Sequence, residues 1–191
     1  DDFQSIYRFT GCDLSLFVNF YTFFDSAKIK KIETTYRNSN ELVKVAGNFV
    51  MKNKMQIKKD LTSYKSLPKP IKVYVYKNIK EDFNRLIDLV STHYRNIMIL
   101  GRNNNDIYMY LNDNFVYKEG KIIYKNNKEL NIYYLTAHKS KGLEYPVVFL
   151  VGMEDRNIPK LQIYRRTKGI RRRKKTLLCW INKSRRNFVF N

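Results

Sequence analysis

Four residues carry side chains that suit the chemistry of a nucleotide site. Arg37 follows a short predicted strand at residues 28–33, and its permanently charged fork can pair with two oxygens of a phosphate group. Beside it, Tyr36 offers a flat face on which a base can stack. The amide of Gln4 can both donate and accept hydrogen bonds, and the carboxylate of Glu144 suits ribose hydroxyls. Alone, an exposed loop arginine or an isolated glutamate indicates no function, so the surrounding sequence must decide.

Two aromatic residues near the start of the sequence suit a second kind of chemistry, the binding of single-stranded nucleic acid. Proteins hold single strands by stacking bases on aromatic rings while polar and basic groups follow the phosphates. Tyr7 and Phe9 could provide such rings, three and five positions after Gln4. The alternative is a half-buried strand, which aromatic residues at alternating positions more often indicate.

Three segments in a fixed order resemble the motifs of UvrD-like superfamily 1 DNA helicases. Residues 1–13 (DDFQSIYRFTGCD) resemble GDDxQSIYRFxGAD, residues 33–39 (ETTYRNS) resemble xxNYRS, and residues 136–145 (TAHKSKGLEY) resemble TxHxSKGLEF. One such match would have a real false-positive rate, whereas three long motifs in family order are a strong signal. The resemblance covers nearly the whole chain and is greatest to the helicase IV branch.

The resemblance implies a set of nucleotide-binding residues. Gln4 and Arg37 would be catalytic, with Arg37 on the γ-phosphate and Gln4 between that phosphate and the attacking water. Tyr36 would stack on adenine, and Gly142 and Glu144 would also bind the nucleotide. The implied cofactors are ATP and Mg²⁺.

The resemblance also implies a DNA site. Tyr7 and Phe9 match the base-stacking pair of the family, and His138 matches its DNA-contacting histidine. Thr10 stands where many relatives have Arg, so one phosphate contact is in doubt. The implied partner is single-stranded DNA, or duplex DNA with a single-stranded tail.

Several parts of an ATPase are missing from this sequence. No glycine is followed by Lys-Ser or Lys-Thr, so there is no phosphate-binding P-loop. No Asp-Glu pair follows an apolar strand to hold Mg²⁺, and its ligands would lie in a missing first domain. Lys183 stands where the family has a second γ-phosphate arginine and lacks its bidentate fork. We therefore expect the chain alone to be inactive as an ATPase.

The last part of the chain holds an unusual concentration of positive charge. The formal net charge is +20, and residues 160–191 contain twelve Lys or Arg but no Asp or Glu. One legal back-translation of residues 171–190, read with its first base dropped, gives EEEKRLFYVGLTRAEEILY, which resembles the last ATPase motif of the family. We interpret residues 160–191 as a frame-shifted basic tail, with the shift between Pro159 and Gly169. A genuine basic tail on a nucleic-acid-binding protein stays open as the alternative.

Apolar periodicity predicts helices alternating with strands, and hence an α/β fold. Helices are expected at residues 13–24, 40–53 and 81–93, with a shorter candidate at 106–111. Strands are expected at residues 28–33, 71–76, 97–100, 132–136 and 147–151, with a turn-rich hairpin at 117–126. Beyond residue 160, only short elements at 177–181 or 187–190 are expected.

These elements predict a mostly parallel sheet with helices on both faces. The resemblance implies that this sheet is RecA-like and is the second domain of a P-loop NTPase. Residues 1–13 would be a remnant of the first RecA-like domain, because the sequence starts within a motif. Residues 14–159 would form the second domain, without the large helical insertion of longer relatives. Residues 160–191 would be the basic tail.

Composition sets the remaining limits. Two cysteines cannot form a disulfide framework, and no apolar run reaches the roughly 18 residues that span a bilayer, so we expect a cytoplasmic protein without membrane contact. The resemblance implies a fragment of an ATP-dependent 3′–5′ DNA helicase. A non-catalytic basic nucleic-acid-binding protein and a decayed pseudogene product remain alternatives.

Overall fold

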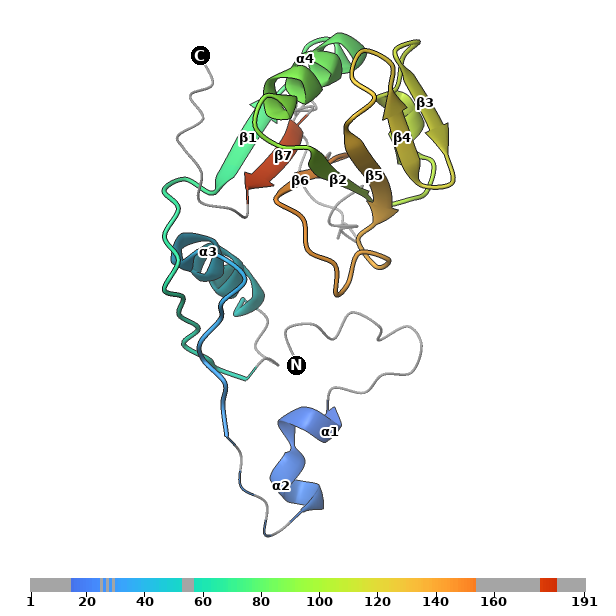
Figure 1. The fold of residues 1–191 in the computed structure, drawn as a ribbon. Coiled ribbons are helices and arrows are strands. Elements are labelled where there is room, and N and C mark those ends of the chain that lie inside the picture. Colours follow the sequence, from blue (N-terminus) through green and yellow to red (C-terminus); the bar gives the residue numbers. More distant parts are fainter. Residues whose placement is uncertain are drawn as a thin grey trace, which may run out of the picture. The chain divides into compact units, whose positions relative to one another are not determined.

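The computed structural model describes residues 15–24, 26, 28, 30–52, 57–153 and 176–181, the last of these by their backbone alone. The chain divides into two compact units, which we describe separately (Figure 1). Unit 1 comprises residues 1–70 and 184–191, and unit 2 comprises residues 71–183. The segment that contains Gln4, Tyr7 and Phe9 lies outside the described residues.

The described part of unit 1 begins with two helical turns where a single helix was expected at residues 13–24. They are α1 (Ser15–Val18) and α2 (Phe20–Phe23), and Asn19 separates them with φ −100° and ψ 35°. The run is rich in aromatic residues, which lose rotamer freedom in a helix. Because α2 also buries no residue, packing does not compensate for this weak propensity.

The third helix of unit 1, α3 (Asn40–Val50), agrees with the helix expected at residues 40–53. Ser39 caps it, because its side-chain hydroxyl accepts a hydrogen bond from the backbone N–H of Leu42 at 3.3 Å. Leu42 and Val43 are its buried residues. The strand expected at residues 28–33 is not formed among the described residues, where an isolated parallel bridge instead joins Thr34 to Thr62.

Unit 2 is built on a seven-stranded sheet with the strand order β1-β7-β6-β2-β5-β4-β3. The strands are β1 (Ile71–Val75), β2 (Asn96–Gly101), β3 (Phe115–Lys118), β4 (Lys121–Tyr124), β5 (Asn131–Thr136), β6 (Val147–Leu150) and β7 (Thr176–Ile181). Two helices accompany them, α4 (Ile79–Ser91) and the single turn η3 (Asp106–Met109).

The α/β class is confirmed, but the expected mostly parallel sheet is wrong. Parallel pairing is confined to the three central strands β6, β2 and β5, whereas β1, β7, β4 and β3 form antiparallel pairs. A tight turn at Glu119 and Gly120, both with positive φ, joins β3 to β4 and forces them antiparallel. In the described part of unit 2, α4 is the one α-helix, so helices on both faces are not seen there.

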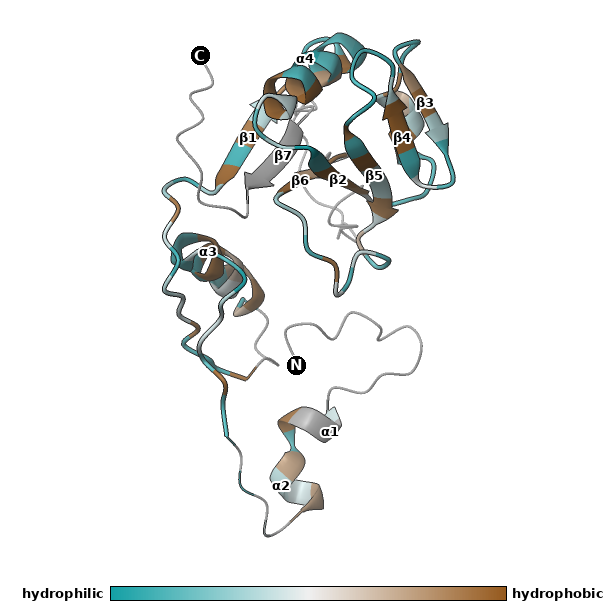
Figure 2. Cartoon of the chain, in the orientation of Figure 1, coloured by the Kyte–Doolittle hydropathy of each residue, from teal (hydrophilic) through white to brown (hydrophobic). Residues whose placement is uncertain are grey.

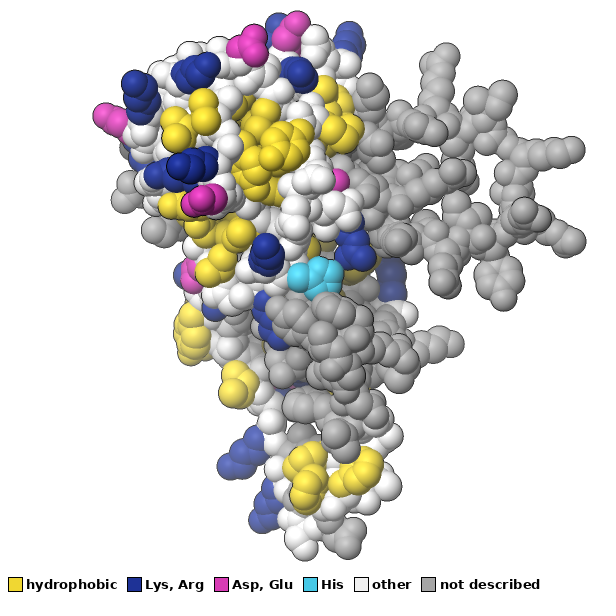
Figure 3. Space-filling model, turned by 90° about the vertical axis from the view of Figure 1, so that its right-hand side faces the viewer, with side chains coloured by type: hydrophobic (Ala, Val, Ile, Leu, Met, Phe, Trp, Pro, Cys, Tyr) yellow, Lys and Arg dark blue, Asp and Glu magenta, His cyan; other side chains and the backbone are white. Residues whose placement is uncertain are grey.

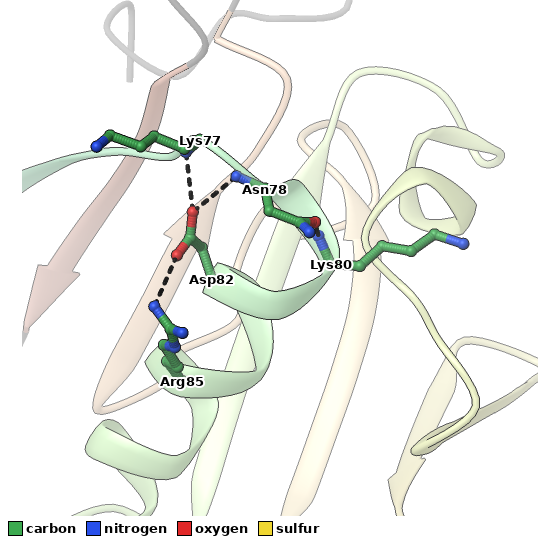
Figure 4. Close-up of polar contacts among 5 residues, drawn as sticks. All are labelled: Lys77, Asn78, Lys80, Asp82 and Arg85. Carbon is green, nitrogen blue, oxygen red and sulfur yellow. Dashed lines mark hydrogen bonds and ion pairs between the residues drawn. The ribbon is translucent and has the colours of Figure 1, made fainter.

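The helix α4 supplies the main apolar face that covers the sheet (Figure 2). Asn78 caps it through a 3.3 Å bond from the Lys80 N–H, and the Asp82 carboxylate accepts bonds from the N–H groups of Lys77 (2.8 Å) and Asn78 (3.0 Å) (Figure 4). Arg85 lies 3.6 Å from the same carboxylate. These contacts fix the start of the helix directly after β1. Its buried residues are Phe83, Leu86, Ile87 and Val90.

The core of unit 2 joins the central strands to a cluster of aromatic rings. Residues 97–100 of β2 are all buried. The ring centroid of Phe83 lies 5.6 Å from that of Tyr110 and 5.4 Å from that of Phe115, which stacks on Tyr124 at 4.7 Å. This cluster packs α4 against the β3–β4 hairpin, so the hairpin expected at residues 117–126 belongs to the core.

The strand β7 lies within the basic tail, at the place where a short element was expected. It pairs antiparallel with β6 on one side and with β1 on the other. The second element expected in the tail, at residues 187–190, lies outside the described residues. Among the helices that the structure describes, none is long and apolar enough to cross a membrane.

Candidate functional site

In unit 1, residues 33–39 form a loop, the Arg37 loop, that leads into α3. Tyr36 and Arg37 are both exposed on it, and the side chain of Tyr36 is 70% exposed. Ser39 closes the loop as the buried cap of α3. The loop therefore presents a ring and a guanidinium group to solvent from a point fixed by the helix start.

A second segment holds the Arg37 loop in place. We call residues 62–67 the strap, because they run along the loop although they are distant in sequence. The backbone bonds between the two run from Thr35 N to Thr62 O (2.9 Å), from Thr62 N to Glu33 O (2.8 Å) and from Asn40 N to Lys65 O (2.8 Å). Such a ladder sets the path of the loop as strand pairing would.

Side chains add further bonds between the strap and the Arg37 loop. The Ser63 hydroxyl donates to the Asn38 carbonyl oxygen at 2.6 Å, and the Ser63 N–H donates to Asn40 Oδ1 at 3.3 Å. The Lys65 ammonium donates to the carbonyl oxygen of Arg37 at 3.4 Å. The backbone at Arg37 is thus bonded from outside the loop.

Glu41, in the first turn of α3, ties down the far end of the strap. Its carboxylate accepts bonds from the Ser66 hydroxyl at 2.6 Å and the Leu67 N–H at 2.8 Å. These bonds, led by the one from Leu67, lower the pKa of Glu41 from 4.5 to about 2. The carboxylate is therefore charged throughout the neutral range.

In unit 2, the second group of candidate residues follows the central strands. Because β2, β5 and β6 are parallel, their carboxyl ends meet at one edge, where Gly101 pairs with Thr136 and Leu100 with Leu150. In open α/β sheets, ligands bind at this edge. Residues 136–145, the His138 loop, start there.

The His138 loop is a compact run of turns. Its N–H and hydroxyl groups bond to nearby carbonyl oxygens: Ser140 N to Thr136 O (3.1 Å), Leu143 N to Ser140 O (3.0 Å) and Ser140 Oγ to Ala137 O (2.9 Å). Gly142 has φ 87°, a conformation that favours glycine. In this loop His138 is half-buried and Glu144 is exposed. Three predicted site residues therefore share one loop.

A neighbouring loop was missed by the sequence reasoning. Residues 101–106 follow β2, and the Asp106 carboxylate accepts bonds from the N–H groups of Arg102 (3.0 Å) and Asn103 (2.8 Å). The Ala137 N–H donates to the Gly101 carbonyl oxygen at 3.2 Å, which links this loop to the His138 loop. A glycine and a polar run directly after a buried strand are the signal that could have revealed it.

Tyr134 of β5 contacts the loop that follows β2. Its hydroxyl donates to the carbonyl oxygen of Asn103. Burial, helped by the charge of Asp106, raises the pKa of Tyr134, so the hydroxyl stays a donor. A Cβ atom on Gly101 would overlap this hydroxyl, so no larger residue fits without moving the Tyr134 ring.

The structure thus brings some predicted site residues together and leaves others apart. Tyr36 and Arg37 share a loop in unit 1, and His138, Gly142 and Glu144 share a loop in unit 2. Among the described residues, no group of three or more His, Cys, Asp or Glu could hold a metal ion. On the face drawn in Figure 3, Lys and Arg side chains lie among apolar ones.

Comparisons with known proteins agree with the motifs. Residues 116–177 match the family described as UvrD-like helicase C-terminal domain. The chain is 30% identical over 158 residues to DNA helicase IV of Escherichia coli (strain K12), a match that covers 81% of this chain and 21% of that protein. It is 28% identical over 147 residues to the ATP-dependent DNA helicase Rep of Buchnera aphidicola subsp. Schizaphis graminum, covering 77% of this chain and 20% of the relative.

The chain spans about a fifth of the length of these relatives. No solved structure matches it significantly. The matched residues 116–177 include the β3–β4 hairpin, the central strands β5 and β6 and the whole His138 loop, and they end inside the tail. On the motifs, the family match and the two relatives, this chain carries a C-terminal region of the UvrD/Rep-like helicase family.

Proposed function

We propose that the chain is part of an ATP-dependent DNA helicase that moves 3′ to 5′ along single-stranded DNA. The observation that carries this proposal is the order of the three motif segments along the chain. Two of them form the Arg37 loop and the His138 loop, which lie at a helix start and at the carboxyl edge of parallel strands. Both kinds of place suit phosphate-bearing ligands.

The family motifs suggest nucleotide-binding roles for residues of unit 1 and, separately, for residues of unit 2. Arg37 would match the charge of the γ-phosphate as the bond to it breaks, and Tyr36 would stack on the base. Glu144 would accept bonds from the ribose hydroxyls, and Gly142 would let the backbone turn toward the ligand. Gln4 would orient the attacking water. Tyr36, Arg37 and Glu144 are all exposed, which supports these roles.

The proposed DNA site uses His138 together with Tyr7 and Phe9. His138 is half-buried, so part of the residue is exposed to solvent. Tyr7 and Phe9 would stack on bases. Single-stranded DNA, or a duplex with a single-stranded tail, is the partner that this chemistry fits.

We further propose that the chain alone hydrolyses no ATP. Its sequence has no P-loop lysine, and its described residues offer no cluster for a metal ion. When bound, Mg²⁺ would neutralise charge on the phosphates, and we assign its ligands to a first RecA-like domain. The test is phosphate release by the purified chain with and without single-stranded DNA. We expect none, and turnover that Arg37→Ala abolishes would contradict the proposal.

A second candidate function is favoured by the charge of the chain. A net charge of +20 would suit a non-catalytic nucleic-acid-binding protein whose basic tail is genuine. The two functions separate on DNA binding at the His138 loop. If binding to a labelled oligonucleotide weakens with His138→Ala, the helicase-type site is supported. If it weakens only when Arg171, Arg172 and Arg173 are changed to Gln, which leaves β7 unchanged, the basic tail carries it.

For the tail itself we propose a shifted reading frame between Pro159 and Gly169. The alternative reading restores an acidic run and a Thr-Arg-Ala string. It also keeps residues 176–181 apolar, as LFYVGL in place of TLLCWI, so a strand at β7 suits both readings. Sequencing the coding strand decides the matter. A stop codon in the second frame, or no LTRA-like string there, would end the proposal.

A further inference from the structure

Two exposed tyrosines from distant parts of the sequence lie side by side in unit 1. The ring centroids of Tyr36 and Tyr64 are 6.1 Å apart, with 33° between the ring planes. The exposed fractions of the two side chains are 70% and 85%. The two rings are thus neighbours, and most of the surface of each residue remains exposed to water.

Folding does not account for this pair. Apolar surface stabilises a fold in proportion to the area removed from water, and these rings remove little. Single exposed aromatic residues are ordinary, but Tyr64 is placed against Tyr36 by a specific set of bonds. A ring pair that is held in place and left open is a surface suited to another planar group.

The strap determines the position of Tyr64. The residues on both sides of it bond to the Arg37 loop: Ser63 reaches Asn38, and Lys65 reaches Arg37. Glu41 then holds the next two strap residues. Because the neighbours of Tyr64 are fixed, its ring needs little ordering when a ligand arrives, and this favours affinity.

The charges beside the rings indicate what kind of planar group would bind. Arg37 follows Tyr36 and Lys65 follows Tyr64 in the sequence, and the Lys65 ammonium bonds to the carbonyl oxygen of Arg37, so both cationic residues belong to this part of unit 1. The Glu41 carboxylate, which holds the strap, accepts bonds from Ser66 and Leu67. Rings flanked by cations suit a base that carries phosphates, which is the chemistry of a nucleotide.

We propose that Tyr64 is a second base-contacting residue, and that the strap sets it beside Tyr36 so that both rings bind the base of one nucleotide. This inference rests on the proposed function, because it assigns that base to the ATP at Arg37. Glu41 is then a positioning residue, which acts on the base only through the strap.

The test is saturation-transfer NMR of the full chain with ATP alone, which suits weak binding and shows which ligand protons lie against the protein. We expect saturation at the adenine protons. Tyr64→Ala should weaken ATP binding about fivefold to tenfold, as loss of one aromatic stacking partner does. Tyr64→Phe should stay within about twofold, since stacking needs the ring and not the hydroxyl.

Two further variants make the result specific. Tyr21→Ala removes another exposed tyrosine of unit 1, on α2, and should leave ATP binding unchanged. Tyr36→Ala should weaken binding as Tyr64→Ala does. The double variant should lose less than the product of the two single losses, because the rings share one base.

The outcomes separate this inference from the proposed function. If Tyr36→Ala and Arg37→Ala weaken ATP binding while Tyr64→Ala does not, the second ring is refuted and the nucleotide site stands. If none of the three weakens it, or the adenine protons receive no saturation, both are refuted. A short oligothymidylate is the last arm. If its binding depends on Tyr64 and that of ATP does not, the rings serve DNA and the assignment to ATP is wrong.

Discussion

The Arg37 loop and the His138 loop are built in contrasting ways. Among the described residues of unit 1 few side chains are buried, and the Arg37 loop takes its shape from hydrogen bonds to the strap. The His138 loop instead leaves a buried strand and is closed by its own turns. One loop therefore depends on polar bonds between distant segments, and the other depends on the core beneath it. Substitutions should separate the two.

The largest effect should come from the core under the His138 loop. Ile99 is fully buried in β2, between β5 and β6. Ile99→Ala should lower the free energy of unfolding by about 2–5 kcal/mol, since it removes apolar contacts and leaves a cavity. Urea unfolding followed by circular dichroism measures this. Val75→Ala is the control, because Val75 on β1 is 65% exposed, and an equal loss there would contradict the prediction.

A smaller effect should follow from adding a side chain at Gly101, the last residue of β2, where the backbone lies close to the Tyr134 ring. Gly101→Ala would place a Cβ 2.8 Å from Cζ of Tyr134, forcing the ring to move. We expect a loss of about 1–3 kcal/mol, as overpacking usually causes. Gly47→Ala, within α3, is the matched change, since its Cβ would meet nothing within 4 Å.

Gly47→Ala should stabilise the chain by about 0.5–1 kcal/mol, because alanine favours a helix. Opposite signs for the two glycines, in thermal unfolding of both variants, are the expected result. Two losses of equal size would mean that the crowding at Gly101 is not the cause.

The next largest loss of stability should come from removing the cap at the start of α3, beside the Arg37 loop. Ser39→Ala removes the cap of α3 and leaves the Leu42 N–H without its bond, at a cost of about 1 kcal/mol. Amide hydrogen exchange should then rise in the first turn of α3 and in the strap. Faster exchange in the His138 loop as well would show that the two loops are not built independently.

The smallest effect should be a pH dependence confined to the strap. The pKa of Glu41 is lowered from 4.5 to about 2, so its stabilising bonds are complete above pH 4.5 and are lost as pH falls toward 2. Hydrogen exchange at the Leu67 amide should therefore accelerate over that window. Glu41→Gln should remove the pH dependence.

Glu81→Gln is the matched control for this experiment, because Glu81 lies in the first turn of α4 as Glu41 does in that of α3. It should leave the exchange at Leu67 as it was. If the amide exchanges at the same rate at every pH in the unaltered chain, the Glu41 carboxylate does not hold the strap.

The sequence predicted the elements that carry strong apolar periodicity. The helix expected at residues 81–93 is α4, and the strands expected at 97–100, 132–136 and 147–151 are β2, β5 and β6. These segments bury a face or a whole run, and burial leaves a pattern in the residues. Strand direction leaves no such pattern, and for this reason the mixed sheet was not foreseen.

The strap shows why part of the site could not be predicted. Its bonds to the Arg37 loop join serine, lysine, asparagine and glutamate side chains that have no periodicity and are far apart in sequence. Tyr64 was missed for the same reason, since nothing local distinguishes it among fifteen tyrosines. Tyr36 and Arg37 were found because they lie within a recognisable motif. Their roles stay predictions.

The position of β7 affects how the chain can fold during synthesis. In the sheet order, β1 is an edge strand, and its neighbour is β7, made more than a hundred residues later. A chain still attached to the ribosome therefore carries β1, with Val73 and Val75 on it, without this partner until residues 176–181 are translated. Any truncation or altered reading that removes this strand leaves an open sheet edge, the kind of surface on which aggregation begins.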